Sequence, residues 1–191
     1  MVVGSGGAPA GADPAELVLA FANTHDHRGR VPDRLSDAAG LRKWLAAYGA
    51  DGTVSITPAD VIEAREIRDA LVTVLLTHVD ADAAGEDELS AAESALRRAA
   101  HRYPLQANIT RDAAGLVSTQ AGLAGALGSM LAAVVELSQS GAWNRVKACR
   151  NCHHGFVDQS RNSSGTFCRA QCRSQAGMRA YRSRHRPDPE S

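Results

Sequence analysis

Four cysteines gather near the carboxyl end of the 191-residue chain, in two close pairs. Cys149 and Cys152 are separated by two residues, and Cys168 and Cys172 by three. A short knuckle can point both of its sulfurs at one ion, and residues at i and i+4 can share the first turn of a helix. Two such pairs match a tetrahedral four-thiolate zinc site, with each sulfur about 2.3 Å from the metal. We predict one structural Zn²⁺ bound by all four cysteines, with no coordination position left for water.

Two other interpretations of the cysteines are weighed against structural zinc. Two disulfides would need an oxidising compartment, and the N-terminal residues predict no export signal, so we expect a cytoplasmic protein. A zinc site that loses its metal on oxidation is the second alternative. His153 and His154 follow Cys152 directly, but four thiolates already complete the site. We therefore expect both histidines to lie outside the ligand set.

The charge of the chain is divided between its two parts. Residues 1–141 hold 11 basic and 18 acidic residues, whereas residues 142–191 hold 10 basic and 3 acidic ones. An acidic body with a basic tail suggests a polyanionic partner such as nucleic acid. The alternative is that the basic tail docks on the acidic body of the same chain.

Arginines dominate the predicted helix over residues 169–186. Arginine donates two hydrogen bonds from a planar fork, which suits phosphate oxygens and guanine edges. Helical spacing places these arginines in two clusters, and Met178 and Tyr181 opposite the first cluster are expected to pack inward. The candidate nucleic-acid contacts, including two residues in the loop between the cysteine pairs, are Arg161, Asn162, Arg169, Arg173, Arg179, Arg182 and Arg186.

A second polar group lies near the N-terminus, where His25, Asp26 and His27 follow Asn23. We interpret this cluster as solvated surface rather than as a catalytic or metal site, and we expect Asn23 to bond backbone groups at a helix end. The chain contains no nucleotide-binding, hydrolase or metalloprotease motif, so we do not expect an enzyme.

Hydrophobic residues make up 44% of the chain but aromatic residues only 4%, which favours a core of Leu, Val, Ile and Ala between packed helices. Start signals such as Asp13-Pro14 and Thr57-Pro58-Ala59-Asp60 predict helices. Residues 105–110 and 116–119 predict a hairpin, and the apolar run 121–137 predicts a buried helix rather than a membrane span. The predicted class is mainly α with a small β-hairpin. Its parts are a disordered tail (1–12), a helical domain (13–141), a zinc module ending in a basic helix (142–186) and a tail (187–191).

The zinc module resembles the CGNR-type zinc finger family. The resemblance is carried by the knuckle, by Phe156-Val157-Asp158 followed by Ser160-Arg161-Asn162, and by Phe167-Cys168 with Cys172 and the arginine-rich helix. The upstream part resembles the ABATE domain that usually precedes this finger, through Phe21-Ala-Asn23-Thr24 and Trp44-Leu45. The chain departs from the family pattern after Cys172, where Arg173-Ser174-Gln175 stands in place of Gly-Asn-Arg.

The resemblance implies a bacterial, stress-induced transcription regulator with the finger as its DNA-binding part. We therefore expect a zinc-dependent DNA-binding regulator whose N-terminal domain senses a small-molecule effector, with a homodimer left open. The alternative is a zinc-stabilised protein–protein adaptor without nucleic-acid binding.

Overall fold

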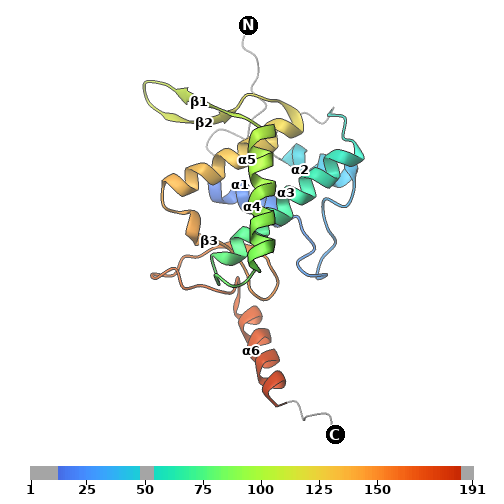
Figure 1. Cartoon of the computed structure of the whole chain (residues 1–191), viewed down its shortest axis with the longest axis vertical. Helices are drawn as coiled ribbons and strands as arrows, with labels where there is room; N and C mark the ends of the chain where they lie inside the picture. The colour runs from blue at the N-terminus through green and yellow to red at the C-terminus, as the bar shows by residue number, and fades with distance from the viewer. Residues whose placement is uncertain (1–12, 48–53, 186–191) are drawn as a thin grey trace.

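The computed structural model describes residues 13–47 and 54–185. The predicted tails, 1–12 and 187–191, and the candidate contact Arg186 lie outside the described residues. The elements follow the order of four helices, a hairpin, a long helix, a second pair of strands and a final helix (Figure 1).

The first helices begin where the sequence places their caps. In α1 (Pro14–Ala22), the Asp13 carboxylate accepts a hydrogen bond from the Ala15 N–H. In α3 (Pro58–Thr77), Thr57 and Asp60 form a reciprocal capping box with Pro58 as the first helical residue. Both caps satisfy backbone N–H groups that a helix N-terminus otherwise leaves unpaired. Two further helices are α2 (Ala38–Ala47) and α4 (Glu86–Arg102).

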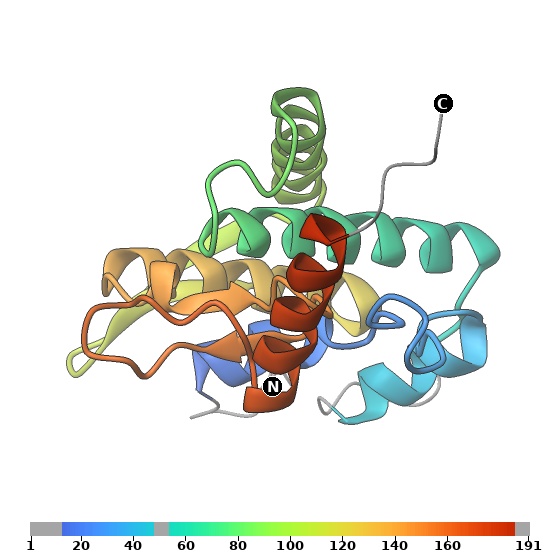
Figure 2. The same ribbon diagram turned by 90° about the horizontal axis from the view of Figure 1, so that it is seen from below.

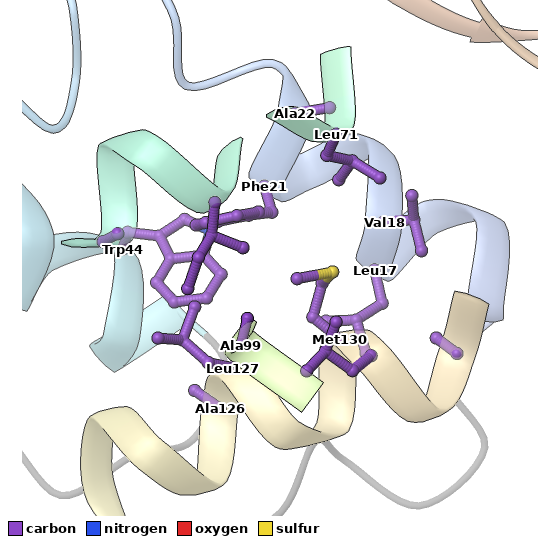
Figure 3. Packing of buried hydrophobic residues seen from close by; sticks show 14 of the residues in the cluster. Leu17, Val18, Phe21, Ala22, Trp44, Leu71, Ala99, Ala126, Leu127 and Met130 are labelled. Atoms are coloured by element: carbon purple, nitrogen blue, oxygen red, sulfur yellow. The ribbon is translucent and has the colours of Figure 1, made fainter. Parts of the chain in front are cut away.

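The core lies where α1 and α2 pack against α5 (Gly122–Gln139) and α3 packs against α1 and α2. Phe21 and Trp44 approach with ring centroids 5.0 Å apart, and Leu127 and Met130 of α5 are fully buried beside them (Figure 3). By length and composition alone α5 could cross a membrane. Its buried side chains pack in this core. The helix therefore matches the buried helix predicted from the sequence.

The predicted hairpin forms from β1 (Leu105–Ile109) and β2 (Ala114–Ser118), paired antiparallel with Leu105 opposite Ser118. β2 packs against α5. The tip of the hairpin extends away from the helices (Figure 1). The fold class predicted from the sequence is therefore confirmed.

A second strand pair, which the sequence reasoning did not predict, follows a short 3₁₀ turn (Trp143–Arg145). β3 (Val146–Ala148) pairs antiparallel with β4 (Gly155–Val157). β3 packs against α3, and β4 against α1. The last helix, α6 (Ala170–Arg184), projects away from the packed helices (Figure 1) and lies in front of them when the molecule is seen from below (Figure 2).

Candidate metal centre and basic helix

The four cysteine sulfurs meet between the β3–β4 pair and the start of α6. All four Sγ atoms lie within 4.8 Å of one another, and those of Cys152, Cys168 and Cys172 are 3.6 to 3.8 Å apart. A tetrahedron with metal–sulfur bonds of about 2.3 Å has edges of about 3.8 Å. All four are free thiols, so the disulfide interpretation is wrong. The donor set fits a tetrahedral Zn²⁺ ion, and the chain holds one structural zinc.

Local backbone geometry positions each pair. The turn between β3 and β4 carries Cys149 and Cys152; the Cys149 N–H donates to the His154 carbonyl at 2.9 Å, and the His153 N–H donates to the Cys149 carbonyl at 2.7 Å. Cys172 lies in the first turn of α6, but Cys168 precedes the helix. The predicted shared first turn is therefore wrong: the backbone is extended at the N-cap, Arg169, and the chain turns into the helix between the two ligands.

Cations and amides around Cys172 favour its thiolate form. Burial opposes ionisation of Cys172, but hydrogen bonds from Asn151 and Arg169 outweigh it and lower its pKa to about 6. The Arg30 guanidinium lies 3.9 Å from the same sulfur. Burial raises the pKa of Cys152 to about 11. Because zinc binds thiolates, its binding must displace protons from the more buried thiols.

The two histidines beside Cys152 are not part of the metal group. Among residues 13–47 and 54–185, the group able to hold a metal consists of the four cysteines. The His154 ring lies against that of His27, with centroids 4.9 Å apart. The prediction that His153 and His154 lie outside the ligand set agrees with this arrangement.

The loop after α1 clamps the zinc knuckle, which corrects the interpretation of its histidines as solvated surface. His25 is only 7% exposed. Its Nε2 lies 2.9 Å from the His153 carbonyl, and its Nδ1 accepts the His27 N–H at 2.7 Å. These two bonds require a neutral ring protonated on Nε2. Burial also lowers the pKa of His25, which favours the neutral ring. The ring is buried because the finger, distant in sequence, packs over this loop.

Asn23 makes the second contact of this clamp. It is the C-cap of α1, as expected for a residue that bonds backbone at a helix end. Its side chain, however, bonds the finger: Nδ2 donates to the Gly155 carbonyl at 3.1 Å, and Oδ1 accepts the Gly155 N–H at 2.7 Å. A Cβ at Gly155 would lie 2.6 Å from Leu19 Cδ2. A larger residue here would therefore require the Leu19 side chain to move.

A buried ion pair fixes the far end of the same loop. Arg68 of α3 is 2% exposed and donates to both carboxylate oxygens of Asp33, at 2.7 and 2.9 Å. The bidentate geometry and the second carboxylate, Asp69, satisfy the guanidinium. The clamp is thus anchored to the helical core at one end and to the finger at the other.

A second buried ion pair orders the loop between β4 and Cys168. Lys147 Nζ donates to Asp158 at 2.7 Å and to the carbonyls of Ser163 and Gly165. Asp158 in turn accepts the Ser160 and Gly165 N–H groups, and these contacts hold its pKa well below the usual range. The motif aspartate therefore has a structural role: it shapes the loop that carries the exposed Arg161 and Asn162.

The arginines of the last helix face solvent. Arg169, Arg173, Arg179, Arg182 and Arg184 are all exposed. Met178 and Tyr181 are 56% and 58% exposed, so the expectation that they pack inward is wrong. Beyond its first turns α6 extends past the other helices (Figure 1). Tyr181 stacks instead on His185, with ring centroids 4.1 Å apart.

A groove joins this helix to the zinc knuckle and adds a residue that the sequence reasoning missed. Arg150 lies in the knuckle, and it faces Arg173 and Arg179 across small side chains of α6; the groove encloses about 540 Å³. Its lining residues are Arg150, Phe167, Arg173, Ala176, Gly177, Arg179 and Ala180. The position of Arg150 between Cys149 and Cys152 is the signal that would have identified it. The loop with Arg161 and Asn162 does not line this groove.

Comparison with known families matches both parts of the chain. The ABATE model, described as "Putative stress-induced transcription regulator", matches residues 15–141, and the model of the CGNR zinc finger matches residues 145–185. Both resemblances seen in the sequence are confirmed. No curated protein matches the chain.

Proposed function

We propose that this chain, which belongs to the ABATE family and carries a CGNR zinc finger, regulates transcription by binding DNA through α6 and the zinc knuckle. The family description supports a regulatory role for the chain as a whole. The DNA contact is our inference from the finger, and its main support is the arginine groove beside the zinc.

Charge distribution supports a polyanionic partner over the rival idea of internal docking. Residues 169–185 contain no acidic residue. Within the described part of the chain, no ion pair joins an arginine of α6 to the acidic body, although Arg150 pairs with Asp80 at 3.2 Å. The arginines of α6 are thus available to an external partner.

The groove suits a phosphate backbone. Three arginines line the hollow together with Ala176, Gly177 and Ala180, whose small side chains leave room for a phosphate backbone beside the helix. Each arginine offers forked donors to phosphate oxygens. Zinc fixes Cys172 in the first turn of α6, so the metal sets the direction in which this basic surface points.

The test is the salt dependence of DNA binding by the zinc-loaded full chain. Fluorescence anisotropy with a labelled 25-base-pair duplex is measured from 50 to 300 mM salt. Six phosphate contacts predict a log–log slope of about −5. In an Arg173→Ala/Arg179→Ala variant we expect weaker binding and a slope shallower by about 2. The control, Arg97→Ala/Arg111→Ala, removes two exposed charges elsewhere and should preserve both values. Equal losses in the two variants would contradict the proposed interface.

One observation favours a second candidate, the protein adaptor. Met178 and Tyr181 lie exposed among the arginines, and apolar side chains of this size at a surface are typical of protein interfaces. If DNA binding is absent even at 50 mM salt, while a Met178→Ser/Tyr181→Ser variant abolishes association with a protein partner, the adaptor replaces the regulator.

A further inference from the structure

A second pocket, remote from the arginine groove, lies between α1, α2 and the loop that clamps the finger. It encloses about 640 Å³, within the usual range for small-molecule sites. Its lining combines two cations, an amide, an aromatic ring and small residues: Ala20, Asn23, Arg34, Gly40, Lys43, Trp44 and Ala47.

The described side chains that line this pocket are basic or neutral, and an acidic group lies at its rim, where the Asp37 carboxylate accepts the Gly40 N–H at 2.8 Å. Among the described residues, no acidic side chain lines it, and neither Arg34 nor Lys43 takes part in an ion pair or a side-chain hydrogen bond. The groove between α3 and α4 has a different charge balance. Its lining contains basic side chains and also the acidic side chains of Asp60, Glu63 and Glu66, and Arg102 pairs with Glu63 at 3.2 Å. Two cations that line one hollow, with neither in an ion pair among the described residues, favour an anionic ligand.

The walls fix the size and character of that ligand. An edge of the largely buried Trp44 and the methyl groups of Ala20 and Ala47 line the pocket, which favours a ligand with an apolar part. At the rim of the pocket, Gly40 packs closely on the backbone of Arg34: a Cβ at Gly40 would lie 2.0 Å from the Arg34 carbonyl oxygen. The absence of a side chain at Gly40 lets α2 pack directly on the backbone of Arg34 and hold that residue at the pocket.

We propose that this pocket binds a small organic carboxylate with an aromatic or aliphatic body. Arg34 and Lys43 pair with the carboxylate, and the ring of Trp44 contacts the apolar part. A planar guanidinium beside an ammonium is a suitable pair for a carboxylate, since the first binds it through two hydrogen bonds.

The pocket shares a residue with the clamp on the finger. Asn23 lines the pocket, and its amide also makes both hydrogen bonds to Gly155 of β4. A ligand that contacts Asn23 is therefore one residue from β4, the strand that follows the knuckle, and this contact is the route by which we propose that it acts on the finger. The proposal that the pocket binds a carboxylate does not depend on DNA binding. The proposal that this binding regulates the finger rests on the proposed function.

Benzoate and its uncharged analogue benzamide are suitable probes. Trp44 and Trp143 are the two tryptophans of the chain, so a Trp143→Phe background leaves Trp44 as the reporter in the zinc-loaded full chain. We expect benzoate to change Trp44 fluorescence saturably, with a dissociation constant at least tenfold lower than that of benzamide. Arg34→Gln and Lys43→Gln should each raise the benzoate constant at least fivefold.

Arg42→Gln is the matched control, because Arg42 is an exposed cation on the same helix that does not line the pocket. It should change the constant less than twofold. Equal affinity for benzoate and benzamide, or an equal loss in Arg42→Gln, would overturn the carboxylate site. Thermal melts of each variant confirm that a lost response does not reflect unfolding.

Hydrogen exchange of the Gly155 amide, measured without DNA, tests the coupling. Saturating benzoate should change its exchange rate at least threefold in the wild type and leave it unchanged in Lys43→Gln. An unchanged rate in the wild type, with benzoate bound, would overturn the coupling. Because these readouts contain no DNA, their failure is distinguishable from failure of the DNA-binding proposal.

Discussion

The helical body and the zinc finger are held together by different physics. The body buries large apolar side chains such as Phe21, Leu71 and Leu127. In the finger, three of the four cysteines are buried, and its other fully buried groups include the ion pair of Lys147 and Asp158. Apolar burial stabilises the body, whereas the metal and a polar network stabilise the finger, so each part should fail under a different perturbation.

The two parts are nevertheless joined by a defined seam. Val146 and Ala148 of β3 belong to the hydrophobic core of the body, while the cysteines form a separate small cluster. Asn23 and His25 add hydrogen bonds from the body to the knuckle. Loss of zinc should therefore release the knuckle and α6 while β3 stays close to the core.

Replacing a zinc ligand should have the largest effect. Structural zinc contributes about 10 kcal/mol or more to small zinc modules, so Cys152→Ser should lose the metal and the fixed position of α6. Elemental analysis should fall from one zinc per chain to none. The cooperative melting of the body should persist, and a complete loss of cooperative melting would contradict the separation of the two parts.

A core substitution should show the opposite pattern. Leu127 is fully buried in α5, and Leu→Ala at such sites costs about 2–5 kcal/mol. Leu127→Ala should lower the melting temperature of the body. At temperatures below that melting temperature, the variant should still bind one zinc per chain. Leu116→Ala, at a 37% exposed position of the hairpin, is the matched control and should cost much less.

Breaking the buried ion pair of the finger should cost nearly as much. Lys147→Met leaves the Asp158 carboxylate buried without its cation, a loss of about 3 kcal/mol, and should disorder residues 158–165 in NMR spectra. Adding Asp158→Asn to this variant should recover part of the lost free energy of unfolding, because no unpaired carboxylate then remains buried. Because the pKa of Asp158 is lowered, its contribution is present above its unfolded pKa and is lost only as pH falls through the folded value.

The smallest expected effect lies at the seam. His25→Leu removes the bond to the His153 carbonyl, at a cost of about 1 kcal/mol. Burial lowers the pKa of His25, so the neutral ring stabilises the fold above the unfolded pKa, and this contribution fades as pH falls through the folded value. Chemical denaturation at pH 7.5 and 5.5 should show a wild-type advantage over His25→Leu that shrinks at the lower pH. An advantage that grows on acidification would contradict the neutral-ring assignment.

The zinc ligands, the helix caps and the buried helix follow from local sequence, because cysteine spacing and capping residues act over a few positions. The burial of His25 could not be predicted this way, since it depends on the finger, 128 residues away in sequence. Asn23 illustrates the same limit: its place at a helix end is local, but its partner Gly155 is not. The exposure of Met178 and Tyr181 depends on where α6 points, which the metal and the clamp determine.

Site-resolved hydrogen exchange of the full chain, before and after zinc removal by a chelator, tests most directly whether the basic helix needs the metal to stay in place. We predict that amides of β4, the knuckle and the first turn of α6 lose their protection, while those of α1, α3 and α5 keep theirs. Unchanged protection around Cys172, or an equal loss in α5, would contradict this account.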